Sequence, residues 1–296
     1  MTAIGDIPTK LPVPRRPERS GVVFRLRRDR IAMVCLFLLV FLIVVALFAH
    51  LIAPQNPNAQ ALTNRLEGPS GKHWLGTDNF GRDLFSRMIV ACRVTLLAVA
   101  EGLGIAVVIG IPTGLISGYL GRATDAIASR VTDGLMAIPP LIFAIAIIGM
   151  LGPGLSKAMI AVGVVLSPRF FRLARAASQS VAQDPYIEAV RADGCSVFRV
   201  LWRHVLPNSS GPLLVQTTLG IGEVIIAEAS LSFLGLGVQA PDASWGSMIR
   251  DGFDVLNESA WSIFPPTIAV VVTIAASFML GDGLRDAIGR KQRVRE

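Results

Sequence analysis

Charged residues are scarce in this chain. Aspartate, glutamate, lysine and arginine make up only 17% of its 296 residues, whereas an ordinary soluble domain carries about 25%. The net charge is +7, but the basic residues fall in short clusters between apolar runs. That distribution argues against a nucleic-acid partner, because such a partner needs basic residues gathered along one face.

Cysteine and histidine are equally rare, with three residues of each. Their scatter over separate segments offers neither a disulfide framework nor metal-ligand spacing. No pairing of His with Asp, of Cys with His, or of two carboxylates forms a catalytic constellation. The sequence therefore predicts no metal site, no catalytic residue and no enzyme. The six residues concerned are Cys35, Cys92, Cys195, His50, His73 and His204.

A nucleotide-binding loop is missing as well. Such a loop needs Gly, four residues, then Gly-Lys-Ser/Thr, so that backbone N–H groups cradle the phosphates. The only Gly-Lys pair is Gly71-Lys72, where Leu66 replaces the first glycine and His73 replaces the hydroxyl residue. The chain cannot hydrolyse ATP by that route.

Long apolar runs are what the sequence does contain, at 52% hydrophobic residues and a mean hydropathy of +0.57. The first run, residues 31–49, has 19 residues without a charge and follows a basic stretch. It exceeds the roughly 7–15 apolar residues of a secretory signal, so we interpret it as a retained membrane span. The Pro- and Arg-rich residues 1–20 before it are expected to form a mobile tail.

Six spans are predicted in an all-α integral membrane protein, since an open strand in lipid would leave its backbone unsatisfied. Each is long enough to cross a hydrocarbon core of about 30 Å. The spans are residues 31–52, 94–119, 134–151, 157–176, 210–236 and 263–284.

Lysine and arginine counts set the expected orientation. With the N-terminus inside, 21 of the 28 basic residues lie in cytoplasmic segments. The predicted organisation is a cytoplasmic N-terminal tail (1–30), a first transmembrane helix (31–52), an extracytoplasmic segment (53–93), a transmembrane core (94–285) that contains a cytoplasmic loop (177–209), and a cytoplasmic C-terminal tail (286–296). A second sizeable outside segment is expected at about 237–262.

Small and charged residues within the spans carry further expectations. Gly110, Gly114 and Gly118 recur every fourth residue and predict close helix packing, within this chain rather than in a dimer. Arg169, Arg172 and Arg175 form one face at the inner end of the fourth span, as positive-inside anchors do. Acids in a span must face the protein interior or water; a translocation path and hydrogen-bonded packing remain open for Glu101, Glu223 and Glu228.

The cytoplasmic loop carries the strongest pattern. A helix is predicted to begin near Pro185, break at Gly194, and give way to a second amphipathic helix that stops at Leu206-Pro207. Its apolar side would pack on the protein while its charges face water. The residues expected to pack are Ile187, Ala189 and Val190, and those facing water are Glu188 and Arg191.

This loop resembles the coupling loop of ABC importer permeases. The residues that match the family's motif are Glu188, Ala189, Gly194, Leu206 and Pro207, with Val190 in place of a second alanine and His204 in place of the usual isoleucine. In that family the loop docks into a groove on a cytoplasmic ATPase. The resemblance therefore implies an ATPase-coupling role for residues 184–207.

Two further stretches extend the resemblance to the dipeptide and oligopeptide branch, C-type subunit. Residues 73–87 are similar to the segment before the second span, and residues 228–239 with 244–246 are similar to the fifth span and its exit. The resemblance implies the type I ABC importer permease fold, a bacterial inner-membrane location, and import of peptides. It also implies a homologous permease partner, two ATPase subunits or domains that bind ATP and magnesium, and an extracytoplasmic solute-binding protein.

An ion-coupled secondary transporter is the alternative, with Glu101, Glu223 or Glu228 as the ion site. The loop at 184–207 disfavours it, because a secondary carrier has no need of an ATPase-docking element. The sequence does not identify the solute.

Overall fold

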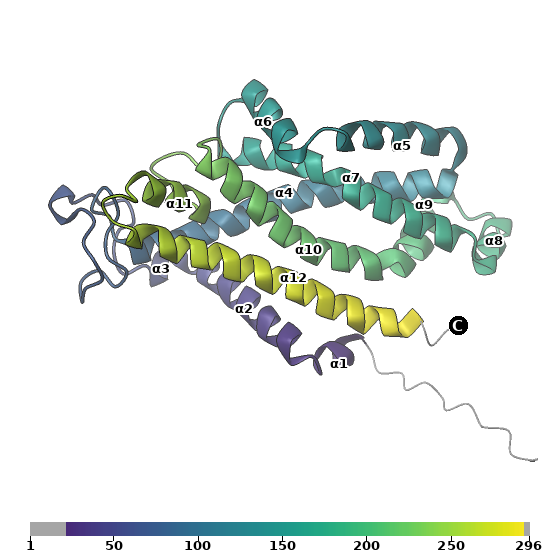
Figure 1. Cartoon of the computed structure of the whole chain (residues 1–296). Helices are drawn as coiled ribbons and strands as arrows, with labels where there is room; N and C mark the ends of the chain where they lie inside the picture. The colour runs from purple at the N-terminus through teal and green to yellow at the C-terminus, as the bar shows by residue number, and fades with distance from the viewer. Residues whose placement is uncertain (1–21, 293–296) are drawn as a thin grey trace, which may run out of the picture.

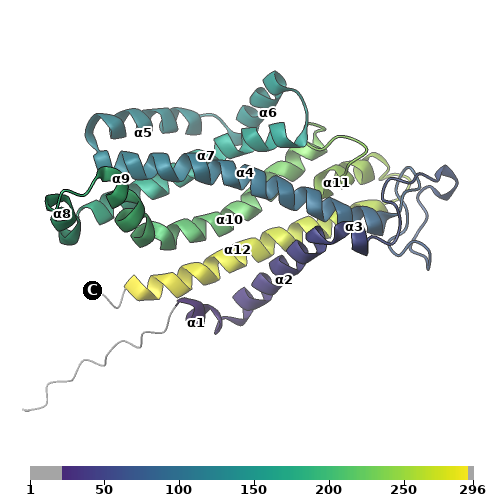
Figure 2. The ribbon, with the colours of Figure 1, turned by 180° about the vertical axis from the view of Figure 1, so that it is seen from behind.

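The computed structural model describes residues 22–292, so most of the expected N-terminal tail and the last four residues lie outside it. The described chain is an elongated bundle of helices (Figures 1 and 2). No β-strand occurs between residues 22 and 292. The helices are α1 Val22–Leu26, α2 Arg30–Leu47, α3 Ala49–Ile52, α4 Leu84–Leu120, α5 Arg122–Met136, α6 Pro140–Leu151, α7 Leu155–Ala182, α8 Pro185–Ala192, α9 Val197–Val200, α10 Leu206–Phe233, α11 Trp245–Asp254 and α12 Phe264–Gln292.

Four stretches of helix are long and apolar enough to cross a membrane: α2, α4, α12, and α10 together with the turns before it. Helix α7 has 28 residues, about 42 Å, but arginines lower the hydropathy of its second half. The six expected spans correspond to α2, α4, α6, α7, α10 and α12. Helix α4 begins ten residues earlier than expected, where the side chain of Asp83 caps the Ser86 amide at 2.8 Å. Helix α7 ends six residues later than the expected fourth span, and α12 ends eight residues later than the expected sixth.

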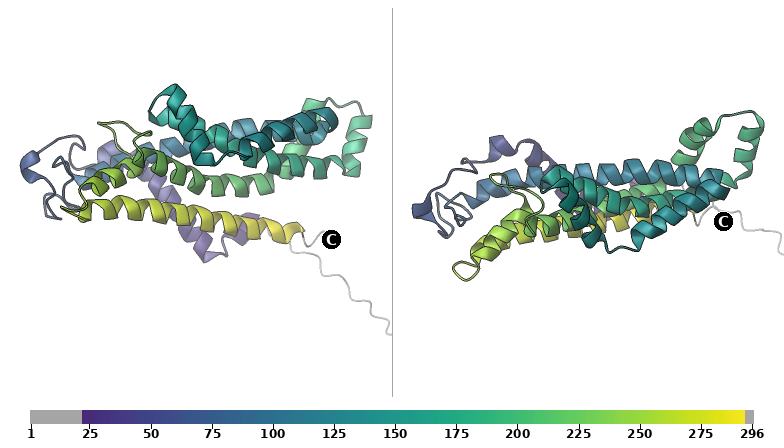
Figure 3. Two further views of the ribbon diagram at one scale, coloured as in Figure 1. Left: turned by 45° about the horizontal axis from the view of Figure 1, so that its top comes forward. Right: turned by 90° about the horizontal axis from the view of Figure 1, so that it is seen from above.

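The expected span at 134–151 is not a single helix. Helix α5 ends at Met136, α6 begins at Pro140, and the axes of the two helices differ by 92°. The cause is the Pro139-Pro140 pair, because each proline lacks an N–H group and forces the residue before it out of helical geometry. Helix α6 has 12 residues, about 18 Å, which falls short of a hydrocarbon core of about 30 Å. Helices α5 and α6 lie along one side of the bundle (Figure 3).

The glycine stripe of α4 packs directly on the backbone of α7. A β-carbon added at Gly110, Gly114 or Gly118 would lie within 2.4–2.5 Å of a carbonyl oxygen of α7. These oxygens belong to residues 167, 171 and 175, which repeat at the same four-residue interval. The prediction of close packing within the chain is confirmed.

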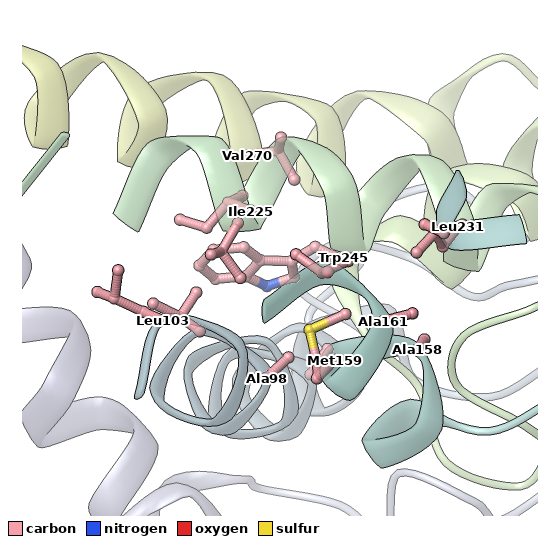
Figure 4. Close-up of a cluster of buried hydrophobic side chains, with 14 of the residues drawn as sticks. Ala98, Leu103, Ala158, Met159, Ala161, Ile225, Leu231, Trp245 and Val270 are labelled. Carbon is pink, nitrogen blue, oxygen red and sulfur yellow. The ribbon is translucent and has the colours of Figure 1, made fainter. Parts of the chain in front are cut away.

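The largest of three apolar clusters in the described chain joins these helices (Figure 4). Trp245 of α11 lies at its centre, and its indole N–H donates to the Met88 carbonyl of α4 at 3.2 Å. Met159 of α7, Ile225 of α10 and Val270 of α12 surround this ring. Because one aromatic side chain contacts four helices, α11 is fixed to the bundle although it is short and amphipathic.

The two ends of the bundle differ. Residues 53–83 and 237–262 meet at one end, which we name the cap end, and residues 183–207 form the other, the loop end (Figure 1). At the cap end, the Trp261 indole donates to the Leu75 carbonyl at 2.8 Å and ties the two segments together. The described termini lie toward the loop end, where Arg25 of α1 donates to the Ala287 carbonyl of α12 at 3.2 Å.

Buried charges hold the cap end. The Asp78 carboxylate accepts from the Arg82 guanidinium at 2.6 Å and from the Phe80 amide at 2.8 Å. Arg87 lies 3.4 Å from the same carboxylate. Asp251 of α11 approaches the Arg82 guanidinium at 3.4 Å. Burial raises the pKa of the Asp251 carboxyl, although the charges of Arg87 and Arg82 act to lower it. The cap end is therefore a closed network of opposite charges.

Candidate functional site

The loop end begins where α7 ends. Asp184 takes an extended conformation, and Pro185 occupies the first helical position of α8. Proline suits this position, because its missing N–H is one that the helix would leave unbonded anyway. The predicted helix start at Pro185 is confirmed.

One buried side chain anchors α8. Ile187 is 0% exposed and packs with Ala174 of α7, Leu115 of α4 and Leu213 of α10. Val190 packs beside it, whereas Glu188 and Arg191 are exposed as predicted. The predicted packing of Ala189 is wrong. Ala189 is exposed, because two residues from Ile187 along a helix is about 200° around its axis.

Gly194 forms the turn after α8 with φ +75°. This left-handed conformation favours glycine, since a β-carbon there crowds the backbone. No other atom lies within 4 Å of where a β-carbon of Gly194 would stand. The requirement for glycine within this chain is therefore conformational, not one of space, and the predicted break at Gly194 is confirmed.

The helix after the turn does not stop at Leu206-Pro207, contrary to the sequence prediction. Helix α9 continues through a π-helical turn, Leu201–Val205, directly into α10. The amide of Leu206 bonds to the carbonyl of Leu201, one residue farther back than in an α-helix. Pro207 follows this wider turn at the start of α10, and the helix continues past it.

Polar and aromatic contacts hold α8 against α10. The Asn208 side-chain amide donates to the Tyr186 hydroxyl and to the His204 carbonyl, both at 2.8 Å. The rings of Tyr186 and His204 lie 6.4 Å apart, and burial raises the pKa of the Tyr186 hydroxyl. Arg191 stacks over the Tyr119 ring at the end of α4, at 5.6 Å. His204 therefore belongs to the joint between α8 and α10.

The loop end also exposes a group of large apolar side chains, which we name the loop patch: Val197, Phe198 and Trp202. Phe198 is 71% exposed, and its ring lies 5.9 Å from that of Trp202. Sequence reasoning missed this patch. The four-residue spacing of Phe198 and Trp202 is the signal that could have found it, because it places both rings on one helix face.

A cavity of about 380 Å³ opens midway along the bundle, between α6, α7 and α10. Most of its wall is apolar, with Leu141, Val165 and Ile226 among the lining residues. Two charged side chains also line it, and they form an ion pair between Arg169 of α7 and Glu223 of α10.

Comparison with known proteins identifies the chain. Residues 110–294 match the family described as the binding-protein-dependent transport system inner membrane component. The chain belongs to this family. Residues 20–69 of the permease also match the N-terminal transmembrane domain of oligopeptide transport permease C. The expected membership, and with it a multi-pass inner-membrane subunit that is not itself catalytic, is confirmed.

Relatives of the permease match over nearly their whole length. The dipeptide transport system permease protein DppC of Alkalihalophilus pseudofirmus is 39% identical over 269 residues, which is 91% of this chain and 88% of that protein. The probable D,D-dipeptide transport system permease protein DdpC of Escherichia coli is 37% identical, over 92% of this chain and 91% of its own. The inward-facing MetNI methionine ABC transporter matches with a TM-score of 0.56 and 19% identity, over 69% of this chain and 97% of that one. This match confirms the fold.

The three intramembrane acids of the permease are not brought together. Glu101 is half-buried on α4, and Glu223 bonds to Arg169 across the cavity wall. Glu228 is completely buried among the helices, where it accepts a hydrogen bond from the Ser232 hydroxyl at 2.7 Å. Of the three, only Glu223 lines the cavity.

The three arginines of α7 each have an acidic partner, which sequence reasoning missed. Arg169 pairs with Glu223, Arg172 with Asp133 at 2.7 Å, and Arg175 with Asp125. The last two acids lie on α5, so α5 is held to α7 by two ion pairs. These arginines therefore join helices as well as adding positive charge to this half of α7.

Proposed function

We propose that this permease is the C-type subunit of an ATP-driven importer of dipeptides and other short peptides. Its family role supports transport, and its dipeptide-permease relatives at 37–39% identity support the substrate class. The observation that carries the coupling role is the loop end. There a short helix with an exposed face, an exposed apolar patch and a glycine turn coincide with the loop that resembles an ATPase-docking motif.

The proposed partners follow from the missing nucleotide-binding loop and from the family. A homologous permease would complete the pathway, and two cytoplasmic ATPase subunits or domains would bind ATP and magnesium. An extracytoplasmic protein would deliver the peptide. The energy of ATP would then enter this chain through mechanical contact at the loop end.

The proposed coupling runs through the buried core of the loop end. Ile187 connects α8 to the inner ends of α4, α7 and α10, so a displacement of α8 by a closing ATPase moves all three helices together. Interlocked packing of this kind shifts between discrete arrangements rather than deforming continuously. The pathway would thereby open alternately to the two sides of the membrane. Glu188, Ala189, Gly194, His204, Leu206 and Pro207 are the residues that we assign to this coupling element.

The proposed orientation places the loop end and both termini in the cytoplasm. The described termini lie toward the loop end, and the positive-inside count favours the same side. Cys195, which is partly exposed, should react with a membrane-impermeant thiol reagent in inverted vesicles but not in intact cells. A cysteine at Ser70 in the cap end should show the opposite pattern. Labelling of Cys195 in intact cells would reverse the orientation and remove the coupling loop from the ATPase.

Transport itself is tested with the complete importer in proteoliposomes. Uptake of radiolabelled alanyl-alanine should require ATP, the binding protein and both permeases, and this chain alone should show no ATP hydrolysis. Uptake by the chain alone under a proton or sodium gradient would instead support the ion-coupled alternative.

A further inference from the structure

We infer that the cavity between α6, α7 and α10 is a contact site for the transported peptide, in which the Arg169–Glu223 pair separates to receive the carboxylate and the ammonium group of one zwitterionic molecule. The inference rests on the proposed function and names the residues at which the permease itself meets its substrate.

The depth of the ion pair is the first observation. Arg169 lies midway along the 28-residue helix α7, about 20 Å from either end. Glu223 lies ten residues before the end of α10, so it too is far from both ends. The pair is therefore distant from the ends of both helices, and since both helices are expected spans, it is expected at membrane depth.

The exposure of the pair is the second observation. The side chain of Arg169 is 47% exposed and that of Glu223 is 23% exposed, although both are expected at membrane depth. Charged groups this deep face a water-filled cavity or another protein, because lipid cannot solvate them. Glu228 on the same helix shows the contrast, since it is completely buried inside the chain. The side of the bundle that carries the pair therefore faces away from lipid.

The shape and chemistry of the cavity are the third observation. Its volume of about 380 Å³ lies near the lower end of the roughly 300–1,000 Å³ of small-molecule sites, which suits a short peptide better than a long one. Apolar side chains such as Leu141 and Ile226 form the wall and would accommodate the peptide's side chains. The two charged side chains in the wall would orient the peptide by its charged ends.

Exchange of ion pairs explains why both charges are needed. At rest, Arg169 and Glu223 neutralise one another, so a lone anion or cation that entered would pair with one of them and leave the other without a partner. A molecule with both a carboxylate and an ammonium group replaces each partner by an equivalent one. The planar guanidinium suits a carboxylate because it can donate two parallel hydrogen bonds. The site should therefore prefer free peptides to peptides blocked at either end.

Accessibility tests whether the cavity holds water. In a variant that lacks Cys195, Ile226→Cys places a thiol in the cavity wall, and Val271→Cys places one on the exposed face of α12, away from the cavity. A water-soluble thiol reagent should label Ile226→Cys, in either the ATP-free or the vanadate-trapped complex, and should leave Val271→Cys unlabelled. Equal protection of both cysteines in both states would overturn the inference.

Ligand protection tests what the cavity accepts. Alanyl-alanine at saturating concentration should slow labelling of Ile226→Cys at least tenfold, whereas N-acetyl-alanyl-alanine amide, which has no charged end, should not. Adding Arg169→Gln or Glu223→Gln should abolish the protection. Arg172→Gln is the matched control, since Arg172 pairs outside the cavity, and it should leave the protection intact. Protection by the blocked peptide, or protection that survives both cavity variants, would overturn the inference.

Uptake measurements separate this inference from the proposed function. As a control, Arg172→Gln should keep uptake, assembly and basal ATP hydrolysis normal. Arg169→Gln and Glu223→Gln should each lower alanyl-alanine uptake at least tenfold. Normal uptake in both variants would refute the contact site while leaving the peptide importer in place. A wild-type importer that carries no peptide would refute the proposed function itself.

Discussion

The cap end and the loop end of this permease differ in what holds them together. At the cap end, the buried Arg82 and Arg87 lie between the carboxylates of Asp78 and Asp251, and Trp261 bonds to Leu75 far away in the sequence. At the loop end, α8 has a single fully buried side chain, Ile187, and most of its other side chains are exposed. One end keeps its shape from contacts within the chain. The other presents the surface that a partner would need to complete it.

The largest loss of stability should follow from breaking the buried ion pairs of the cap end. Asp78→Ala removes the carboxylate that two buried arginines share, and a broken buried ion pair costs about 3–5 kcal/mol. The melting temperature of the solubilised protein should fall sharply. Arg65→Ala, which removes the exposed pair with Glu258, is the control and should change it little. Equal losses in the two variants would mean that the buried network does not hold this end.

Ile187→Ala should have the next largest effect, confined to the loop end. Truncating a fully buried isoleucine costs about 2–5 kcal/mol, and here the loss should loosen α8 from the bundle rather than unfold it. Hydrogen exchange of the amides in 185–192 should speed up, while exchange at the cap end stays unchanged. Val197→Ala, at an exposed position, should alter neither. A global loss of protection would show that the two ends unfold as one unit.

Gly194→Val should disturb the turn by about 1–2 kcal/mol, because a β-branched residue resists the left-handed conformation. Gly194→Asn should be tolerated, since asparagine adopts that conformation more readily and its side chain meets open space. Both proteins should insert normally. Solute-stimulated ATP hydrolysis of the complete importer should fall for the valine variant only. If the valine variant couples normally, the loop does not transmit the ATPase stroke.

Glu188→Ala should have the smallest effect. Glu188 lies in the first turn of α8, where a negative charge gains about 0.3–1 kcal/mol from the helix dipole. Losing it should weaken ATPase co-purification less than Gly194→Val does. A stronger effect than that of Gly194→Val would indicate a direct ionic contact between Glu188 and the ATPase.

The sequence predicted those features that depend on local geometry. The glycine spacing in α4, the helix start at Pro185 and the turn at Gly194 all follow from backbone rules over a few residues. The division of the third span at Pro139-Pro140 follows from the same rules, but hydropathy alone concealed it. The passage of α9 into α10 could not be predicted, because a π-helical turn before Pro207 forms only where packing of Leu201 and Val205 favours it.

The ion pair between Arg169 and Glu223 shows another limit. The two residues are 54 positions apart, and nothing in either segment alone indicates its partner. The sequence did indicate that Glu223 needs a partner, because an acid in an apolar span requires an ionic partner or water. Tertiary packing of α7 on α10 then decided which base would meet it.

The contact between α4 and α7 has a mechanical consequence. Glycines on one helix meet carbonyl groups on the other at matching intervals of four residues, so a small axial slip would drive backbone against backbone. The two helices, about 55 and 42 Å long, are therefore expected to resist sliding past one another along their axes. A displacement at Ile187 would therefore move α4 and α7 together, and the helix break at Pro139-Pro140 and the π-helical turn would allow the bending.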